Sequence, residues 1–582
     1  SVTTANAGTN GNGGDVIVYS PDTALFRPEA KIEAKGGTKS GDGGFVEVSG
    51  KKLVEVYGSV DASAANGMSG TFYIDPTDVT ISDATLNMDN SPNWNPVAPD
   101  ADTGTIDAAT IITSLQNGTD VSVDTSDDDS GSGTGRIIVD SAISVDLSTV
   151  GGGSVETPTL TLNAQDDIDI NAQIGVSTTD AAGDLLNLDL NATNGVDIGA
   201  NITDLSGGTL TSDGTTFNNT GTITTNGGDI ILTHTGAVTI GDALSTGAGT
   251  VDIDTDSTLA LNAGISTSSG SVLLDSTGTT TVAAGVLLRF ASSEIYRADK
   301  TGTLTTSGDI ITTDDDVTFT RAVTLGGNVD IDTAGGAAGD ILFSSTIATG
   351  GNDLALDAGS AGNITLTDAL TGGGDVTVRD GAIQSYQAMT LNSLAIQDAT
   401  TSVTFNDDVT STTNIGVVSG GTVEVAAGDR LIAGGDSTTL NIDGAGITLN
   451  AGGAGTETVT NTGNGTITIN DSGTTSLANN SISIDTGTLT IDSDIIDAPG
   501  NSTEIFTNGD VSLTGAQIGG PLANDPIDID FATPSGTNTL TVNSDGDGDV
   551  GIDINADLFD EVNVTIAGVT TDVISIDSAS DT

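Results

Sequence analysis

Acidic and amide side chains that alternate with glycine near the end of the chain are the clearest candidates for metal binding. They are Asn543, Asp545, Asp547 and Asp549. Oxygen atoms from residues with this spacing begin many calcium loops. A loop that starts at Asn543 has Gly548 at its sixth position, as required, but Ile554 at the twelfth, where a bidentate Glu belongs. The sequence therefore predicts either a weak or shared calcium site or an acidic turn.

A second group of residues combines positive charge with aromatic rings within residues 287–300. Its members are Arg289, Phe290, Tyr296, Arg297 and Lys300. The chain has 13 Lys and Arg residues against 80 Asp and Glu residues, so these cations stand in strongly acidic surroundings. A basic and aromatic patch on such a protein is suited to dock against an acidic face of a second copy. The two interpretations are a self-contact surface and an insertion whose charges are compensated locally.

Catalysis has few candidate residues in this sequence. Enzymes that cleave polysaccharides on β-helical scaffolds combine carboxylates with a nearby Arg, Lys or His. Carboxylates occur throughout the chain, but its single histidine, His234, has no recurring basic neighbour. We interpret His234 as a structural or surface residue and expect no catalytic residues and no cofactor other than calcium. The alternative is a polysaccharide-active enzyme that works with a pair of carboxylates.

Composition excludes several other functions. The formal net charge of −67 excludes nucleic acid as a ligand, because phosphate binding needs a basic surface. An anionic membrane would repel most of the chain, and no apolar run approaches the roughly 20 residues of a membrane helix. The absence of cysteine excludes disulfides, thiolate metal sites and cysteine nucleophiles.

The elements that carry these residues follow one repeated phrase, a glycine followed by aliphatic residues at the second and fourth positions after it. The phrase begins at Gly228, Gly249, Gly270, Gly327, Gly374, Gly421, Gly465, Gly487 and Gly509. Its spacing is constant among the first three glycines and again among the last three. A fixed recurrence of short alternating strands favours the coils of a right-handed parallel β-helix over a β-sandwich. We expect coils of about 19–22 residues.

One segment, residues 107–117, has the pattern of a short helix. Asp107 can cap its N-terminus, Ile112 and Leu115 share a face, and Asn117 with Gly118 forms a stop. We expect this helix to lie laterally on the coils. The chain then divides into N-terminal coils (1–82), a loop excursion with the helix and connecting coils (83–159), and a repetitive β-helix (160–582).

Several phrases near the N-terminus occur together in a characteristic order. Residues 43–50 read GGFVEVSG, residues 74–81 read IDPTDVTI, and residues 160–172 read LTLNAQDDIDINA. In this order they resemble the filamentous haemagglutinin and high-molecular-weight adhesin family of two-partner secretion exoproteins. The resemblance covers about residues 11–175, and beyond it only generic repeats continue.

The resemblance implies a parallel β-helix that passes through an outer-membrane transporter partner and acts outside the cell or on its surface. It implies adhesion, aggregation or matrix building, with a cell-surface or glycan receptor as a partner. The family's secretion domain would lie upstream of Ser1. A different expectation, a filament subunit that stacks end to end, follows from the open sheet edge at an uncapped end of a β-helix.

Overall fold

The computed structural model is almost entirely β, with 53% of residues in strands and 2% in helix. It describes residues 1–433 apart from 52, 84–102, 126–132, 149–154, 291–300, 314, 335–338 and 427–428, and beyond residue 433 it describes strands alone. The chain divides into two compact units, Ser1–Gly302 and Thr303–Thr582. The predicted segment boundaries after residues 82 and 159 both fall inside the first unit.

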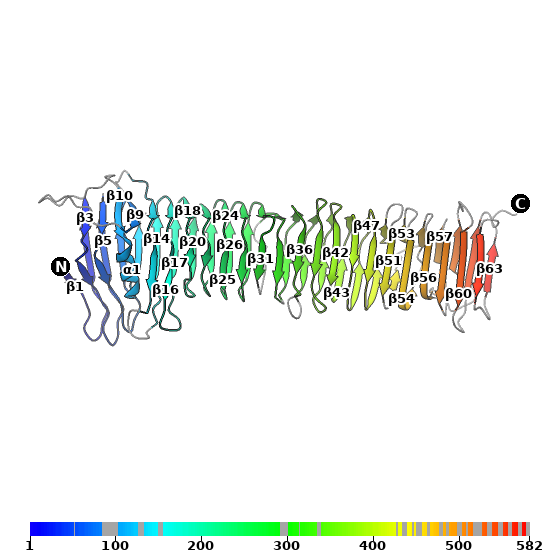
Figure 1. Cartoon of the computed structure of the whole chain (residues 1–582), viewed down its shortest axis with the longest axis horizontal. Coiled ribbons are helices and arrows are strands. Elements are labelled where there is room, and N and C mark those ends of the chain that lie inside the picture. Colours follow the sequence, from blue (N-terminus) through cyan, green and yellow to red (C-terminus); the bar gives the residue numbers. More distant parts are fainter. Residues whose placement is uncertain are drawn as a thin grey trace. The chain divides into compact units, whose positions relative to one another are not determined.

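Most coils of the N-terminal unit contribute one strand to each of three parallel sheets (Figure 1). The first sheet contains β2 (Asp15–Ser20), β5 (Phe45–Gly50), β8 (Thr71–Asp75), β11 (Asp120–Asp124), β14 (Thr159–Ala164), β17 (Asn187–Ala192), β20 (Leu210–Gly214), β23 (Ile230–His234), β26 (Val251–Thr255) and β29 (Val272–Ser276). The second contains β3 (Thr23–Phe26), β6 (Leu53–Val56), β9 (Asp78–Ser82), β10 (Thr103–Asp107), β12 (Ile137–Val139), β15 (Ile168–Ile170), β18 (Gly195–Ile198), β21 (Thr216–Asn219), β24 (Val238–Ile240), β27 (Leu259–Leu261) and β30 (Thr280–Val282).

The third face has the helix in its middle. Before the helix lie β1 (Val2–Thr4), β4 (Lys31–Glu33) and β7 (Ser59–Asp61). After it lie β13 (Ile143–Asp146), β16 (Ile174–Thr178), β19 (Ile202–Thr203), β22 (Ile223–Thr224), β25 (Leu244–Gly247), β28 (Ile265–Thr267) and β31 (Leu287–Phe290). The parallel pairing of strands from successive coils confirms the predicted parallel β-helix.

Columns of buried aliphatic side chains form the core of this unit. On the first sheet one column of consecutive register partners is Val121, Leu160, Leu188, Leu210, Ile230, Val251 and Val272. All are buried, while the next residue in each strand is more exposed. Burying each such side chain contributes about 1.5–3 kcal/mol. The aliphatic positions of the repeated phrase therefore face inward, as the alternation predicts.

Coil length is regular only in part of the N-terminal unit. The register partners Leu188, Leu210, Ile230 and Val251 follow one another at intervals that agree with the predicted coil length. Earlier coils are longer than predicted, as the pairing of Val121 with Leu160 shows. Only the strands stack, so a solenoid accepts insertions at its corners with little cost to the core.

The glycine of the repeated phrase lies at a crowded corner between coils. A Cβ on Gly249 would lie 2.1 Å from the carbonyl oxygen of Gly228, and one on Gly270 would lie 1.9 Å from that of Gly249. A buried threonine three residues earlier supports the same corner. The hydroxyls of Thr246 and Thr267 donate to the carbonyls of Gly249 and Gly270, both at 2.5 Å. Close backbone approach therefore requires glycine at these positions.

The predicted helix is present as α1 (Ala108–Gln116), with Asp107 as its N-cap and Gly118 at φ 74° after its end. Its buried aliphatic residues are Ile111 and Leu115, whereas the sequence pattern assigned Ile112 to that face. It contacts β7 and β13, and so takes the place of a strand on the third face. The helix is therefore part of a β-helix face and does not lie laterally on the coils as we expected. Among the described residues, no helix has the length and apolarity needed to cross a membrane.

The C-terminal unit also stacks parallel strands, from β32 (Leu304–Thr306) to β63 (Val573–Asp577). Its core includes aromatic stacking between Phe319 on β34 (Val317–Phe319) and Phe343 on β37 (Ile341–Phe343), with ring centroids 4.5 Å apart. Such pairs contribute about 0.5–1.5 kcal/mol beyond their buried area. The unit is therefore a second stretch of the same architecture.

Candidate functional site

A polar column runs along the outer surface of the second sheet in the N-terminal unit. Asp169 on β15, Asp197 on β18 and Asn218 on β21 are consecutive register partners. They face outward because the residues on either side of each in its strand are inward and buried. The amide nitrogen of Asn218 donates to the Asp197 carboxylate (2.9 Å). The column thus repeats hydrogen-bonding groups from coil to coil.

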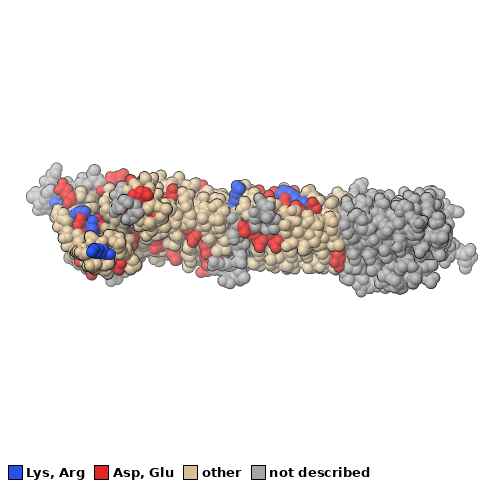
Figure 2. Space-filling model, turned by 90° about the horizontal axis from the view of Figure 1, so that it is seen from below, with Lys and Arg blue, Asp and Glu red and all other residues tan. Residues whose placement is uncertain are grey.

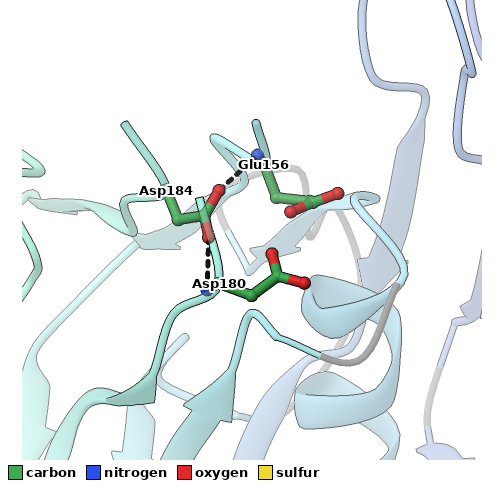
Figure 3. A group of neighbouring side chains, drawn as sticks. All are labelled: Glu156, Asp180 and Asp184. Atoms are coloured by element: carbon green, nitrogen blue, oxygen red, sulfur yellow. Dashed lines mark hydrogen bonds between the residues drawn. The ribbon is translucent and has the colours of Figure 1, made fainter. Parts of the chain in front are cut away.

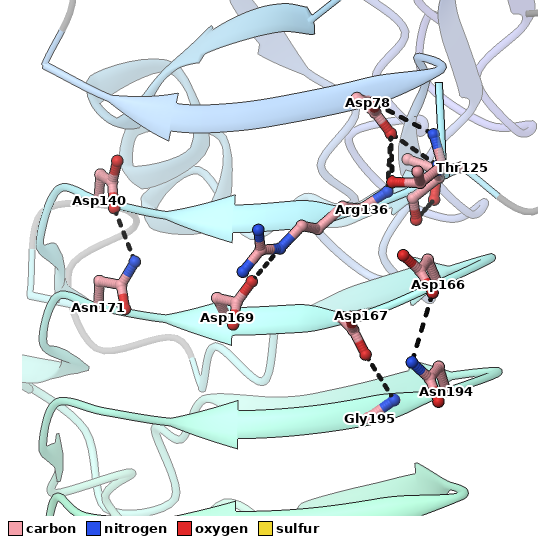
Figure 4. A network of polar contacts seen from close by, with 12 residues as sticks. Asp78, Thr125, Arg136, Asp140, Asp166, Asp167, Asp169, Asn171, Asn194 and Gly195 are labelled. Carbon is pink, nitrogen blue, oxygen red and sulfur yellow. Dashed lines mark hydrogen bonds and ion pairs between the residues drawn. The ribbon is translucent and has the colours of Figure 1, made fainter. Parts of the chain in front are cut away.

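Arg136, directly before β12, brings a positive charge to the start of this column (Figure 4). Its Nε–H donates to the Asp169 carboxylate. That hydrogen bond is the largest cause of the raised pKa of the Arg136 guanidinium. Burial opposes it, and the charges of Asp169, Asp167 and Asp166 act in the same direction as the hydrogen bond. The pair is partly exposed, so its contribution to stability is within about 1 kcal/mol. Its main effect is to orient Asp169.

Asp78 holds the backbone of Gly135 and Arg136 in place through hydrogen bonds. The carboxylate of Asp78 accepts the backbone N–H groups of Gly135 (2.6 Å) and Arg136 (2.9 Å). The buried hydroxyl of Thr125 donates to the carbonyl of Gly135 (2.7 Å). Figure 4 shows these contacts at the corner that precedes β12. The backbone at Arg136 is therefore held from both sides, by Asp78 and by Thr125.

An open hollow of about 220 Å³ lies over this surface. It is lined by Asp167, Asp169, Gly195, Val196, Asp197, Thr216 and Asn218. The Asp167 carboxylate accepts the N–H of Gly195 (2.9 Å), and a Cβ at Gly195 would lie 2.8 Å from the Thr216 hydroxyl oxygen. The hollow is smaller than the roughly 300–1,000 Å³ of ordinary ligand pockets. Its carboxylate, amide and hydroxyl groups suit a small polar ligand rich in hydroxyls, such as one sugar ring.

The sequence reasoning missed this hollow, although a signal was present. The short phrases Ile168-Asp-Ile170 and Val196-Asp-Ile198 place an aspartate between two inward aliphatic residues. Aspartates in that position on stacked strands must share the outer surface. Because the coils differ in length, the sequence alone does not show which of these aspartates become register partners.

The predicted basic and aromatic patch is only partly described by the structure. Arg289 and Phe290 are successive residues of β31, so their side chains leave opposite faces: Arg289 is exposed and Phe290 is buried in the core. The structure therefore does not bring Phe290 onto a surface with Arg289. Tyr296, Arg297 and Lys300 lie outside the described residues.

The predicted calcium loop also lies largely outside the described residues. Asn543 belongs to β60 (Asn538–Ser544), and only its backbone is described. Asp545, Asp547 and Asp549 are outside the described residues, so the calcium interpretation at this loop stays a prediction.

His234 lies inside the coils, at the end of β23. It is 2% exposed, its ring packs against Phe217 with centroids 5.5 Å apart, and its Nε2 lies 3.2 Å from the hydroxyl oxygen of Ser212. Burial lowers its pKa to about 4. This neutral, enclosed ring fits the structural interpretation of His234.

Compared with known proteins, the chain matches no family model and no curated protein.

Proposed function

We propose that the chain is an extracellular, non-enzymatic β-helical protein that binds polar ligands through its repetitive outer surface, in the manner of an adhesin. The observation that carries this proposal is the column of Asp169, Asp197 and Asn218 with its adjoining hollow. Glycan hydroxyls both donate and accept hydrogen bonds, and this surface offers both kinds of partner. Repetition along stacked coils adds avidity for a repetitive glycan.

The net charge and its distribution agree with a neutral glycan as ligand. On the face shown in Figure 2, acidic side chains are spread over the described surface of each unit, and in the N-terminal unit basic ones gather mostly at the first coils. Such a surface repels polyanions. Export through an outer-membrane transporter partner belongs to the same proposal and is supported by the family resemblance of residues 11–175.

Binding of the purified chain to a panel of neutral and acidic glycans, and to cells, tests the proposal. We expect binding to neutral glycans, and a double substitution Asp197→Ala and Asn218→Ala should weaken it about tenfold or more, the effect of losing ~1.4 kcal/mol. A matched control is Asn328→Ala with Asp353→Ala, a similar Asn–Asp pair between coils of the C-terminal unit (3.0 Å). Equal binding by both double variants would contradict the assignment to the hollow, and no binding by the wild type would contradict adhesion.

A further inference from the structure

Three acidic residues that are distant in sequence converge in the N-terminal unit. Glu156 lies shortly before β14, and Asp180 and Asp184 lie in the turn between β16 and β17 (Figure 3). One carboxylate oxygen from each lies within 4.8 Å of the others. The backbone holds the two segments together, because the N–H of Leu185 donates to the carbonyl of Glu156 (2.9 Å) and that of Asn187 to the carbonyl of Pro158 (3.0 Å).

Asp184 is the fixed member of this acidic cluster. It is 1% exposed, and its carboxylate accepts the backbone N–H groups of Glu156 (3.1 Å), Asp180 (3.0 Å) and Ala181 (2.9 Å). Burial opposes ionisation, but these three hydrogen bonds, with a smaller contribution from a side-chain hydrogen bond of Glu156, lower the pKa of Asp184. Its Oδ2 accepts two of the bonds and its Oδ1 accepts one, so Oδ1 keeps a lone pair for a further partner. Asp184 is thus an ionised, oriented ligand.

One carboxyl oxygen of Glu156 lacks the partner that its buried environment demands. The residue is 8% exposed, and its Oε2 is buried with no hydrogen-bond partner. Figure 3 shows its carboxyl group on the side of the cluster toward Asp180. Burial, followed by the negative charges of Asp184 and Asp180 and by a side-chain hydrogen bond to Asp184, raises the pKa of Glu156 to about 7. A buried carboxylate oxygen needs a proton or a cation, and beside two aspartates a cation offsets all three charges.

We propose that Glu156, Asp180 and Asp184 bind a calcium ion that ties the turn before β17 to the entry of β14. All three ligands are carboxylate oxygens, the type that hard cations prefer. Oxygens up to 4.8 Å apart fit on opposite sides of Ca²⁺, whose bonds to oxygen measure about 2.4 Å. Mg²⁺, with bonds of about 2.0–2.1 Å, requires a tighter and strictly octahedral set. Asp180 is exposed, so water completes the coordination from its side.

A second group of three carboxylates in the C-terminal unit provides the contrast. Asp407, Asp408 and Asp429 also place their oxygens within 4.8 Å of one another. There the guanidinium of Arg430 lies 2.7 Å from Asp408 and supplies a positive charge. All three carboxylates are partly exposed to water. Asp429→Asn is therefore a matched control for loss of an acidic charge.

Calorimetric titration of the EDTA-treated full chain with CaCl₂ or MgCl₂, at roughly 150 mM KCl to screen weak surface binding, tests the proposal. We expect one tight calcium site. Glu156→Gln and Asp180→Asn should each raise its Kd about tenfold or more, whereas Asp429→Asn should leave it unchanged. Asp180 is exposed, so Asp180→Asn should fold and can still be titrated with calcium if Glu156→Gln fails to fold.

Thermal unfolding separates a ligand role from a structural one. In EDTA, Glu156→Gln should be as stable as the wild type or more stable, because it removes an unpaired buried acid. With about 2 mM Ca²⁺, above the dissociation constants of roughly 10⁻⁴–10⁻³ M of extracellular modules, the wild type and Asp429→Asn should gain more Tm than Glu156→Gln. Calcium affinity unchanged in both variants would overturn the site, and Mg²⁺ binding as tight as Ca²⁺ would overturn the choice of ion. Failure of glycan binding would leave this result untouched.

Discussion

His234 makes the N-terminal unit sensitive to acid at one buried position. Its pKa in the folded chain is about 4, below the ordinary 6.5, because burial disfavours the charged ring. Between these values the unfolded chain binds a proton that the folded chain does not. Stability from the neutral ring is therefore complete above about pH 6.5 and is lost as the pH falls to 4, a change on the order of 3 kcal/mol.

Hydrogen exchange of the amides in β23 and β26 at pH 7 and pH 4.5 measures this effect. His234→Gln removes the titrating ring. Between pH 7 and pH 4.5, the opening free energy of these amides should therefore fall less in the variant than in the wild type, by most of the ~3 kcal/mol. The many aspartates titrate in both proteins and cancel in the comparison. Identical pH profiles would show that His234 does not contribute.

A threonine hydroxyl supports each glycine corner in the regular coils. Thr246→Val keeps the shape of the side chain but removes the donor to the carbonyl of Gly249. We expect a loss of about 1–2 kcal/mol, the usual cost of leaving a buried polar group unpaired. Thr246→Ser keeps the hydroxyl and should lose less in chemical denaturation. Equal losses for Val and Ser would assign the effect to packing instead.

Residue spacing makes some of these features predictable and hides others. Thr225, Thr246 and Thr267 each stand three residues before a phrase glycine, so a search for that spacing finds the corner bonds. No such spacing links Glu156 to Asp184. They meet because the interval between paired β14 and β17 includes a turn whose path the sequence does not specify.

At the scale of elements, the glycine corners limit how closely coils stack. Gly249→Ala would place a Cβ 2.1 Å from a backbone oxygen that cannot move without shifting the coil. We expect a loss of about 3 kcal/mol or more, as for other strained backbone positions. Gly416, on β48 (Ile415–Val418), has its nearest such atom at 3.9 Å, so Gly416→Ala should be neutral or stabilising by up to about 1 kcal/mol.

Urea denaturation of each glycine variant beside the wild type gives this comparison. A Gly249→Ala protein as stable as Gly416→Ala would contradict close stacking as the reason for the repeated glycine.

The elements themselves were largely predictable, because alternation and capping act locally. Ile230 and Leu232 face inward as the strand period requires, and Asp107 caps α1. The exact buried face of α1 was not predictable. Ile111 is buried because α1 replaces a strand on the third face and contacts β7 and β13, an arrangement that the local sequence does not specify.

At the scale of the whole molecule, charge repulsion between coils opposes the stacking of apolar columns. The chain carries 80 acidic residues, and strand register places some directly opposite one another, as with Asp169 and Asp197 or Asp332 and Asp357. Stacked coils lie about 4.8 Å apart, within the Debye length of about 30 Å at 0.01 M salt. Like charges at this distance destabilise paired strands.

Salt should therefore raise stability through screening, and individual aspartates should reveal the mechanism. At 1 M NaCl the Debye length is about 3 Å, so we expect Tm to rise between 0.01 and 1 M. Asp332→Asn removes the repulsion between Asp332 and Asp357. It should stabilise the chain by up to about 1 kcal/mol at low salt but not at high salt. Asp408→Asn removes one ion-pair partner of Arg430 and should have the opposite sign at low salt. Thermal unfolding of both variants in EDTA, at the two salt concentrations, measures the difference without calcium. Shifts of the same sign in both variants would mean that the repulsion between stacked coils is not what salt relieves.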